Sequence, residues 1–286
     1  MMPLFAGLAG PLLSARGIPT TLWYTHRARS AQLRWGLAMS RTVVSADETS
    51  FPYDTDKLRV IGHGIDCEFY APAPDQVAVG DAAPLVAQVA RLAAVKHQAT
   101  TIGAVAGTEA RLALIGGAQA GSPQGYEKGL REQIRRLGIE ERCRLLGDMP
   151  AAEVLEWYRR ATVAVNMSPA GLFDKAALES MACGVPTVVC NPAFAPLLGE
   201  HAPLLLTAGP EDVGGLSQRL TRLFALSAVE RAEIGAALRE NVRREHSLPA
   251  MTERLLAVLR TGELPSRRSY SRYRAATRLR QHRLLL

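Results

Sequence analysis

The sequence predicts an α/β protein built on parallel sheets with helices on both faces. Short apolar and β-branched runs alternate along the 286 residues with segments of helical periodicity, as in chains of βαβ units. The expected strands are apolar throughout, which is typical of strands buried on both faces. A linker rich in Pro, Ala and Gly at 71–83 divides the chain into a small first unit and a larger second unit.

The first unit, 1–70, is expected to hold strands at 20–25, 41–46 and 59–64. In the second unit, 84–226, the expected strands are 84–89, 111–116, 142–147, 161–167, 185–190 and 202–207. Helices are expected at 97–107, 124–137, 150–160, 175–183 and 211–225. The second unit therefore resembles a complete doubly wound domain, whereas three strands make an incomplete first unit.

Two helices are expected at 228–245 and 248–260, within a segment 227–262 that is broken at Pro249. Gly184 should end the helix 175–183 in a left-handed conformation, and Pro186 should open the next strand.

Net charge argues against a nucleic-acid groove in the folded body. The tail, 263–286, contains seven arginines from 264 onward, and the rest of the chain carries 27 basic and 27 acidic residues. The formal net charge of +7 therefore belongs to the tail, which could contact anionic lipid headgroups, RNA phosphates, or solvent alone. Lipid headgroups are our preferred partner among the first two.

Cysteine usage and loop motifs narrow the chemistry. The four cysteines form no CxxC pair and have no histidine at ligand spacing, so the pattern favours neither a zinc site nor a disulfide framework, and it fits a cytoplasmic setting. The chain has no GxGxxG after a strand and no GxxxxGK[ST], so neither a dinucleotide fingerprint nor a P-loop is predicted.

Two segments carry candidate site residues. Arg91 and Lys96 follow an expected strand, at the edge where open α/β sheets bind ligands, and both could converge on a diphosphate. The alternative is two solvated charges at a turn. Further on, Glu179 lies just over one turn into the helix 175–183, where a carboxylate could accept hydrogen bonds from two ribose hydroxyls or could simply face solvent.

Five ordered motifs across roughly 18–226 resemble the family-4 retaining glycosyltransferases of the GT-B fold. They are GHGIDCEFYAP (62–72), VARLAAVKH (89–97), LALIGGA (112–118), the segment 137–150 and ALESMACGVPTVV (177–189). The resemblance implies a GT-B α/β fold with a complete C-terminal donor domain and an N-terminal domain truncated to its later half.

The resemblance also implies roles for individual residues. A nucleotide-diphospho-sugar donor would be the co-substrate, without another cofactor or a metal ion. Its ribose would bind Glu179, and its diphosphate would bind Arg91, Lys96, Phe173 and Lys175. The base and donor edge would lie at Gly116, Gly117, Leu146, Gly147 and Met149.

Catalytic positions in the resemblance fall on Asp174 and His26. The family usually carries a Glu-x7-Glu pair that would end at Glu179, but the first position here is Gly171. Asp174, in Gly171-Leu172-Phe173-Asp174-Lys175 as in some relatives, could replace the missing acid. His26 could reach the sugar across the cleft or merely cap a strand. Of the other histidines, His63 should shape the interdomain hinge, and His246 should be solvated.

The expected function is a metal-independent, retaining transfer of sugar from a nucleotide-sugar to a glycan or lipid-linked acceptor, in cell-envelope or polysaccharide synthesis. The protein would be cytoplasmic, with a peripheral membrane contact through its tail. The alternative is a truncated, non-catalytic nucleotide-sugar-binding module. Either way, an incomplete first unit should expose an apolar patch near residues 1–25.

Overall fold

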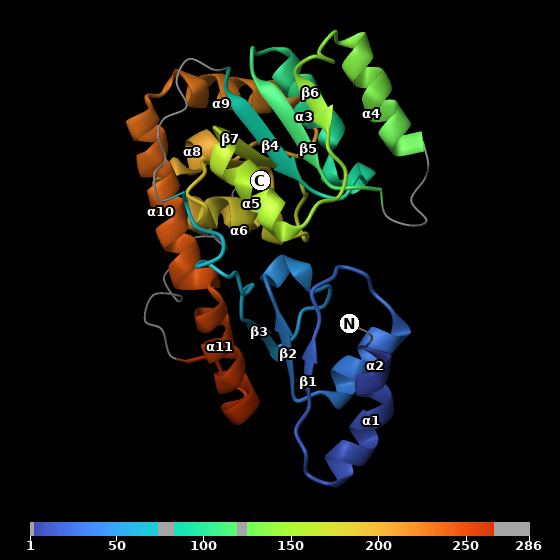
Figure 1. The fold of residues 1–286 in the computed structure, drawn as a ribbon. Coiled ribbons are helices and arrows are strands. Elements are labelled where there is room, and N and C mark those ends of the chain that lie inside the picture. Colours follow the sequence, from blue (N-terminus) through green and yellow to red (C-terminus); the bar gives the residue numbers. More distant parts are fainter. Residues whose placement is uncertain (1–2, 74–82, 119–124, 266–286) are drawn as a thin grey trace, which may run out of the picture.

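The computed structural model describes residues 3–73, 83–118 and 125–265, which form two α/β units joined by long C-terminal helices (Figure 1). The predicted tail from 266 onward, with its lipid contact, and most of the predicted linker lie outside the described residues. Among the described helices, none is both long and apolar enough to cross a bilayer.

A three-stranded parallel sheet of order β1-β2-β3 forms the first unit. Its elements are α1 (Leu4–Ala15), β1 (Thr21–Trp23), α2 (Ala31–Met39), β2 (Thr42–Ser45), the 3-10 turn η1 (Glu48–Ser50) and β3 (Leu58–Val60). Adjacent side chains of β2 pack on opposite faces: Val43 clusters with Leu33 of α2 and Val44 with Val258 of the C-terminal helix. The small sheet is therefore covered on both sides.

The second unit holds a five-stranded parallel sheet of order β6-β5-β4-β7-β8. Its strands are β4 (Leu85–Val89), β5 (Arg111–Ile115), β6 (Cys143–Leu145), β7 (Val163–Asn166) and β8 (Thr187–Val189). The helices between them are α3 (Gln98–Ala106), α4 (Gly125–Arg136), α5 (Ala151–Arg160), α6 (Lys175–Ala182) and α9 (Val213–Ala225), with the 3-10 turn η2 (Ala94–Lys96). Because β4 pairs with both β5 and β7, the strand order reverses there, and ligands bind beyond such a reversal in open α/β sheets.

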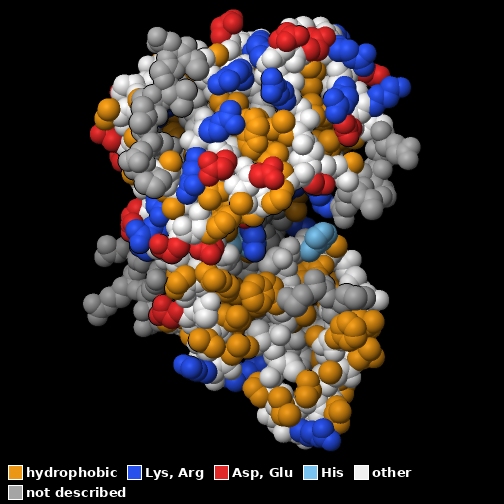
Figure 2. Space-filling model, viewed as in Figure 1, with side chains coloured by type: hydrophobic (Ala, Val, Ile, Leu, Met, Phe, Trp, Pro, Cys, Tyr) orange, Lys and Arg blue, Asp and Glu red, His pale blue; other side chains and the backbone are white. Residues whose placement is uncertain are grey.

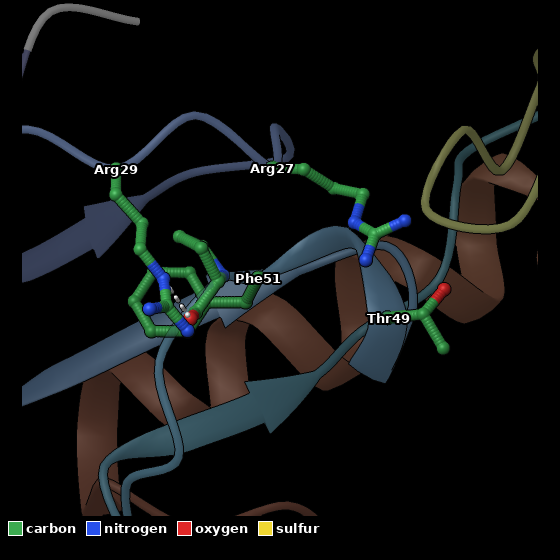
Figure 3. Close-up of a pocket in the computed structure, with 5 residues that line it drawn as sticks. Arg27, Arg29, Thr49 and Phe51 are labelled. Carbon is green, nitrogen blue, oxygen red and sulfur yellow. Dashed lines mark hydrogen bonds between the residues drawn. The ribbon is translucent and has the colours of Figure 1, made fainter.

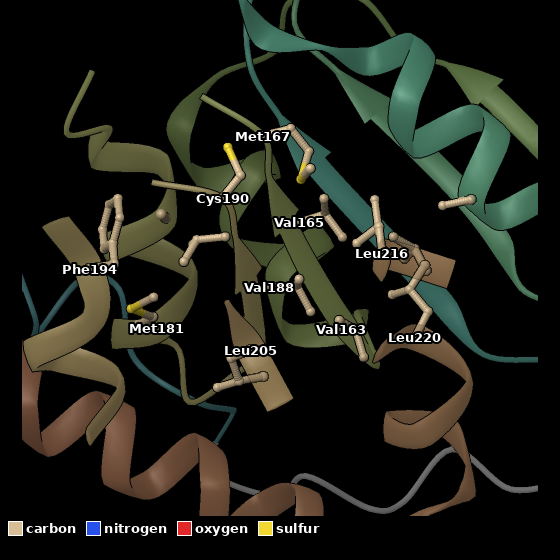
Figure 4. Close-up of a cluster of buried hydrophobic side chains, with 14 of the residues drawn as sticks. Val163, Val165, Met167, Met181, Val188, Cys190, Phe194, Leu205, Leu216 and Leu220 are labelled. Carbon is tan, nitrogen blue, oxygen red and sulfur yellow. The ribbon is translucent and has the colours of Figure 1, made fainter. Parts of the chain in front are cut away.

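The core of the second unit is continuous from the sheet into its covering helices. Figure 4 shows Val163, Val165 and Val188 of the two neighbouring strands beside Leu216 and Leu220 of α9. All five side chains are at most 3% exposed, as expected for strands that are buried on both faces.

The prediction of a strand at 202–207 is wrong. The residues Ala202–Leu205 form a single helical turn, α8, which follows the short segments η3 (Pro192–Phe194), α7 (Ala195–Leu198) and η4 (Gly199–His201). Pro203 lies in the first turn of α8, where it fits a helix and could not donate to a sheet. Leu206 makes one isolated bridge to Val189, so the described sheet of this unit has five strands rather than six.

The turn after α6 forms as predicted. Gly184 has φ = 74°, its N–H donates to the Met181 carbonyl (2.9 Å), and the Val185 N–H donates to the Ser180 carbonyl (3.2 Å). These two hydrogen bonds satisfy the last carbonyl groups of a helix that ends at a left-handed glycine. Pro186 then immediately precedes β8.

Two long helices connect the units: α10 (Ala228–His246) packs on α6, and α11 (Leu248–Thr261) packs on the small sheet (Figure 1). The break falls at Ser247, which caps α11, and Pro249 lies inside the first turn of α11. There the His246 carbonyl accepts from the Ile65 N–H (2.8 Å), and the Ile65 carbonyl accepts from the Leu248 N–H (2.9 Å). The segment after β3 is thus hydrogen-bonded to the break between α10 and α11.

Helix α1 carries the expected exposed apolar side chains. Phe5, Leu8 and Leu12, on one side of this uncharged helix, are 65%, 58% and 56% exposed, and Figure 2 shows hydrophobic side chains gathered over this unit. Its inner side is made of Gly7 and Gly10, which allow the close approach of Trp35 and Met39 from α2.

Replacing Gly235 by Ala should loosen α10 from the second unit. A Cβ at Gly235 would stand 1.8 Å from the Gly184 carbonyl oxygen, a backbone atom that cannot move aside without disturbing the turn. The free energy of unfolding, measured by denaturant titration, should fall by about 1–3 kcal/mol. Gly129→Ala in α4 is the matched control, because its Cβ would meet open space; it should stabilise by about 0.5–1 kcal/mol. Equal effects of the two substitutions would contradict this packing.

Candidate functional site

The carboxyl ends of β4 and β7 bring the predicted cations and acid together. Lys96 ends η2, just after β4, and Asp174 caps the N-terminus of α6, just after β7. The Lys96 Nζ forms an ion pair with Asp174 Oδ2, and both side chains are less than a fifth exposed. The Asp174 carboxylate therefore joins the two loops that flank the strand-order reversal.

Asp174 is saturated with hydrogen bonds from its own chain. Its Oδ2 accepts from Ser168 Oγ (2.8 Å) and Asn166 Nδ2 (3.2 Å) besides Lys96, and its Oδ1 accepts from the Ala176 N–H (3.3 Å). Burial raises the pKa of Asp174, but Lys96 and these hydrogen bonds outweigh it and hold the pKa below its usual value. The carboxylate stays ionised and orients Lys96. Its predicted role toward the sugar stays a prediction.

The loop carrying the cations is fixed by two buried glutamines. Gln88 donates from Nε2 to the Lys96 carbonyl (2.8 Å), and Gln98 donates to the Arg91 carbonyl (2.9 Å). Both glutamines are 1% exposed. Arg91 is exposed at the start of this loop, so the sequence-predicted cation pair lies on one preorganised turn.

Glycines at the ends of β5 and β6 let the neighbouring loops close on one another. Gly116 has φ = 129°, and a Cβ there would stand 2.3 Å from the Ala90 carbonyl oxygen. The Gly116 N–H donates to the Gly147 carbonyl (2.8 Å), and the Gly117 N–H donates to Asp148 Oδ1 (2.7 Å). The predicted donor edge is therefore a contiguous backbone surface beside Arg91, with Leu146 and Met149 packed behind it.

Glu179 lies half-buried on α6. Burial, together with the negative charge of Asp174, raises the pKa of Glu179 to about 7, while Lys175 opposes the shift. The carboxyl can therefore gain or lose a proton near neutral pH. Lys175 is exposed at the first residue of the same helix.

The donor loop, defined here as residues 168–174, is buttressed by a histidine and aromatic rings. Phe173 is buried and stacks on Phe194 (centroids 4.3 Å apart), and its carbonyl contacts His63 Nε2 at 2.7 Å. The Phe173 ring thus belongs to the core, although the residue was predicted at the diphosphate. His63 lies at the hinge, as predicted, and burial lowers its pKa.

His246 is buried, so the prediction of a solvated side chain is wrong. It is 7% exposed, and its Nδ1 accepts from the His63 N–H at 3.2 Å. Burial, and then the nearby His63 and Arg254, lower the pKa of His246 to about 3. A neutral His246 therefore supports the hinge from the end of α10.

In the loop that follows β1, Arg27 contacts the donor loop. His26 is exposed, and its Nδ1 accepts from the Ala28 N–H (2.9 Å) within its own loop. Arg27 Nη1 instead donates to the Ala170 carbonyl (2.9 Å), and a Cβ at Gly171 would stand 1.8 Å from Arg27 Cδ. The arginine occupies the space that a side chain at position 171 would need. Sequence reasoning missed it, although it follows His26 directly.

No group of histidine, cysteine and acidic side chains suited to hold a metal ion occurs within 3–73, 83–118 and 125–265. All four cysteines are buried as free thiols, and burial raises the pKa of each.

Known proteins are similar to this chain in sequence. Residues 83–225 match the family model for Glycosyl transferases group 1. A D-inositol 3-phosphate glycosyltransferase from Kribbella flavida is 30% identical over 171 residues, which cover 53% of this chain and 40% of the relative. A GDP-mannose-dependent monoacylated alpha-(1-6)-phosphatidylinositol monomannoside mannosyltransferase from Corynebacterium glutamicum is 28% identical, over 69% of this chain and 55% of the relative. The chain thus spans about half the length of these relatives.

Solved structures agree on the fold. Anabaena HepE in complex with UDP and glucose superposes with a TM-score of 0.75 at 21% identity, covering 90% of this chain and 75% of that one. A sucrose-phosphate synthase from Thermosynechococcus elongatus gives 0.74 at 20% identity, covering 89% and 70%. Both likenesses establish the two-domain GT-B arrangement of α/β units. Because the family model spans half of the chain, the protein belongs to the group 1 glycosyltransferases.

Proposed function

We propose that the protein transfers a glycosyl group from a nucleotide-diphospho-sugar to an acceptor hydroxyl. The observation that carries this proposal is the Lys96–Asp174 ion pair at the strand-order reversal, with Arg91 on the same pinned loop. A fixed ammonium and an arginine beside backbone amides can neutralise a departing diphosphate without a metal ion. The Anabaena neighbour, a complex with UDP and glucose, lends support.

The proposed reaction needs no reactant besides the sugar donor and the acceptor hydroxyl. The acceptor oxygen forms a bond to the anomeric carbon, and the bond from that carbon to the diphosphate oxygen breaks. The electron pair leaves on the diphosphate, where Arg91 and Lys96 stabilise it, and the hydroxyl proton ends on that phosphate or in solvent. We propose retention at the anomeric carbon from the family resemblance.

We propose a phosphorylated polyol or lipid as the acceptor. The names of the relatives support this choice, because one is a D-inositol 3-phosphate glycosyltransferase and the other acts on a phosphatidylinositol monomannoside.

A non-catalytic nucleotide-sugar-binding module is the second candidate. The observation that favours it is Gly171, which offers no carboxylate beside the sugar, while Asp174 is already engaged by Lys96. Binding of a nucleoside diphosphate without transfer or hydrolysis of the sugar would identify such a module.

Removing either cation should weaken donor binding. We expect UDP or GDP, whichever binds more tightly in calorimetry, to lose about ten- to hundred-fold in affinity with Arg91→Ala or Lys96→Ala, because each substitution removes a charge-assisted contact. Lys128→Ala, an exposed lysine of α4, is the matched control and should bind like wild type. Unchanged affinity in both site variants would eliminate the phosphate role.

Glu179 should make donor binding and stability depend on pH. The ionised carboxylate accepts hydrogen bonds from the two ribose hydroxyls more strongly than the neutral carboxyl does, so UDP affinity should rise, up to about tenfold, between pH 6 and pH 8. Glu179→Gln should flatten this rise, while Glu127→Gln on α4 should not. Pyrophosphate binding should be insensitive to Glu179→Gln.

The same raised pKa has a stability consequence. A carboxyl with a pKa of about 7 in the folded protein and 4.5 when unperturbed stabilises the fold in its protonated form, and that contribution is lost as pH rises from about 4.5 through 7. The free energy of unfolding of wild type should therefore fall relative to Glu179→Gln over this window. A pH-independent difference would show that Glu179 is not buried as described.

The stereochemical outcome can be measured directly. With UDP-α-glucose or GDP-α-mannose and D-inositol 3-phosphate, proton NMR of the product should show an α-linked sugar. Turnover should persist in excess EDTA, because side chains and amides stabilise the leaving diphosphate. A β-linked product would contradict retention, and complete loss of activity in EDTA that Mg²⁺ restores would contradict metal independence.

A further inference from the structure

A hollow of about 460 Å³ lies in the first unit, on the side that faces the donor loop. Its lining, named here the arginine pocket, is Arg27, Arg29, Thr49, Phe51 and Pro52. Figure 3 shows Arg27 and Arg29 extending from one loop, the segment that follows β1. None of the residues predicted to hold the donor lines this hollow.

The pocket is built on a rigid aromatic floor. Phe51 is 6% exposed and packs edge-on against Tyr24 (6.0 Å, 85°) and Tyr53 (6.1 Å, 71°). Arg29 lies over the Tyr53 ring at 5.5 Å and donates from Nε to the Pro52 carbonyl (3.1 Å; Figure 3). The position of its guanidinium is therefore fixed before any ligand arrives.

Both arginines keep hydrogen-bond donors for a ligand. A guanidinium carries five N–H groups. The hydrogen bonds of the described chain use Nη1 of Arg27, to the Ala170 carbonyl, and Nε of Arg29, to the Pro52 carbonyl. The remaining N–H groups are arranged in the planar fork that matches phosphate or carboxylate oxygens.

The surrounding charge favours an anion. Arg27 and Arg29 are the charged residues among the five that line the pocket. Two acids, Asp47 and Glu48, lie beside the lining residue Thr49 of η1. The acid that caps η1, Asp47, turns its Oδ1 toward the Thr49 N–H at 2.8 Å and also accepts from the Thr49 hydroxyl. Burial raises the pKa of Asp47, against these hydrogen bonds. Its charge is thus directed into the turn.

The pocket adjoins the place where transfer would occur. Arg27 covers Gly171 and holds the Ala170 carbonyl, and Ser50 Oγ lies 3.4 Å from the Gly171 carbonyl. Three residues further along, Asp174 holds Lys96. A molecule whose anionic group sat between Arg27 and Arg29 would therefore extend its hydroxyls toward the donor loop.

We infer that the arginine pocket binds the phosphate group of the acceptor, and that Arg27 and Arg29 select phosphorylated over neutral acceptors. This inference rests on the proposed glycosyl transfer and assigns its acceptor phosphate to a site in the first unit. Arg27 has a second role, because its hydrogen bond to the Ala170 carbonyl connects the arginine pocket to the donor loop.

The test is calorimetry on the whole chain saturated with UDP or GDP. The probes are D-inositol 3-phosphate and glycerol 3-phosphate, the neutral inositol and glycerol, and inorganic phosphate. We expect both phosphate esters to bind at least tenfold more tightly than the polyols and than inorganic phosphate. Arg29→Gln should weaken the esters about ten- to hundred-fold and leave UDP binding unchanged. Arg27→Gln should weaken the esters and also disturb the donor loop.

Arg34→Gln, an exposed arginine of α2 outside the pocket lining, is the matched control and should bind every probe like wild type. Three outcomes would overturn the inference: esters no tighter than polyols, inorganic phosphate as tight as the esters, or Arg29→Gln equal to wild type in a folded protein. Failure of UDP and GDP to bind wild type would instead contradict the proposed function, so the two failures are distinguishable.

Discussion

The contact between Lys96 and Asp174 is the constraint on which the site depends. It joins the loops after β4 and β7 across the one place where the strand order of the large sheet reverses. A lysine ammonium in this largely buried position needs a counter-charge, and Asp174 supplies it while also capping α6. Ser168 and Asn166 complete the shell of the carboxylate. The cation is therefore held in place before a donor binds, which is how a fixed electrostatic site avoids reorganisation during reaction.

The same loop is held from the other side by the hinge. The Phe173 carbonyl accepts from His63 Nε2 (2.7 Å), the His63 backbone N–H donates to His246 Nδ1 (3.2 Å), and His246 is the last residue of α10. A carbonyl can only accept, so the His63 tautomer with its proton on Nε2 is the one that fits Phe173. The donor loop is in this way tied both to the large sheet and to the helices that connect the two units.

Much of this arrangement could be predicted from the sequence, because it follows from periodicity and chain order. Lys96 was predicted from its place after an apolar run that reads as a parallel strand, at the edge where such sheets bind ligands, whereas Asp174 was predicted from the family resemblance. The expected strand 202–207 failed because its apolar run contains Pro203, which suits a first helical turn. Arg27 was missed because its partner Ala170 is 143 positions away, and no local pattern encodes such a contact. His246 was misjudged since packing at the hinge, not its own neighbours in sequence, buries it.

We propose that a nucleoside diphosphate binds beyond the carboxyl ends of β4 and β7. The most direct measurement is a crystal structure of the chain with UDP or GDP bound. We predict diphosphate oxygens within about 3.2 Å of Lys96 Nζ and of the Arg91 guanidinium, with the ribose at Glu179. Electron density for the nucleotide at another edge of the sheet, or in the first unit, would contradict this placement of the donor.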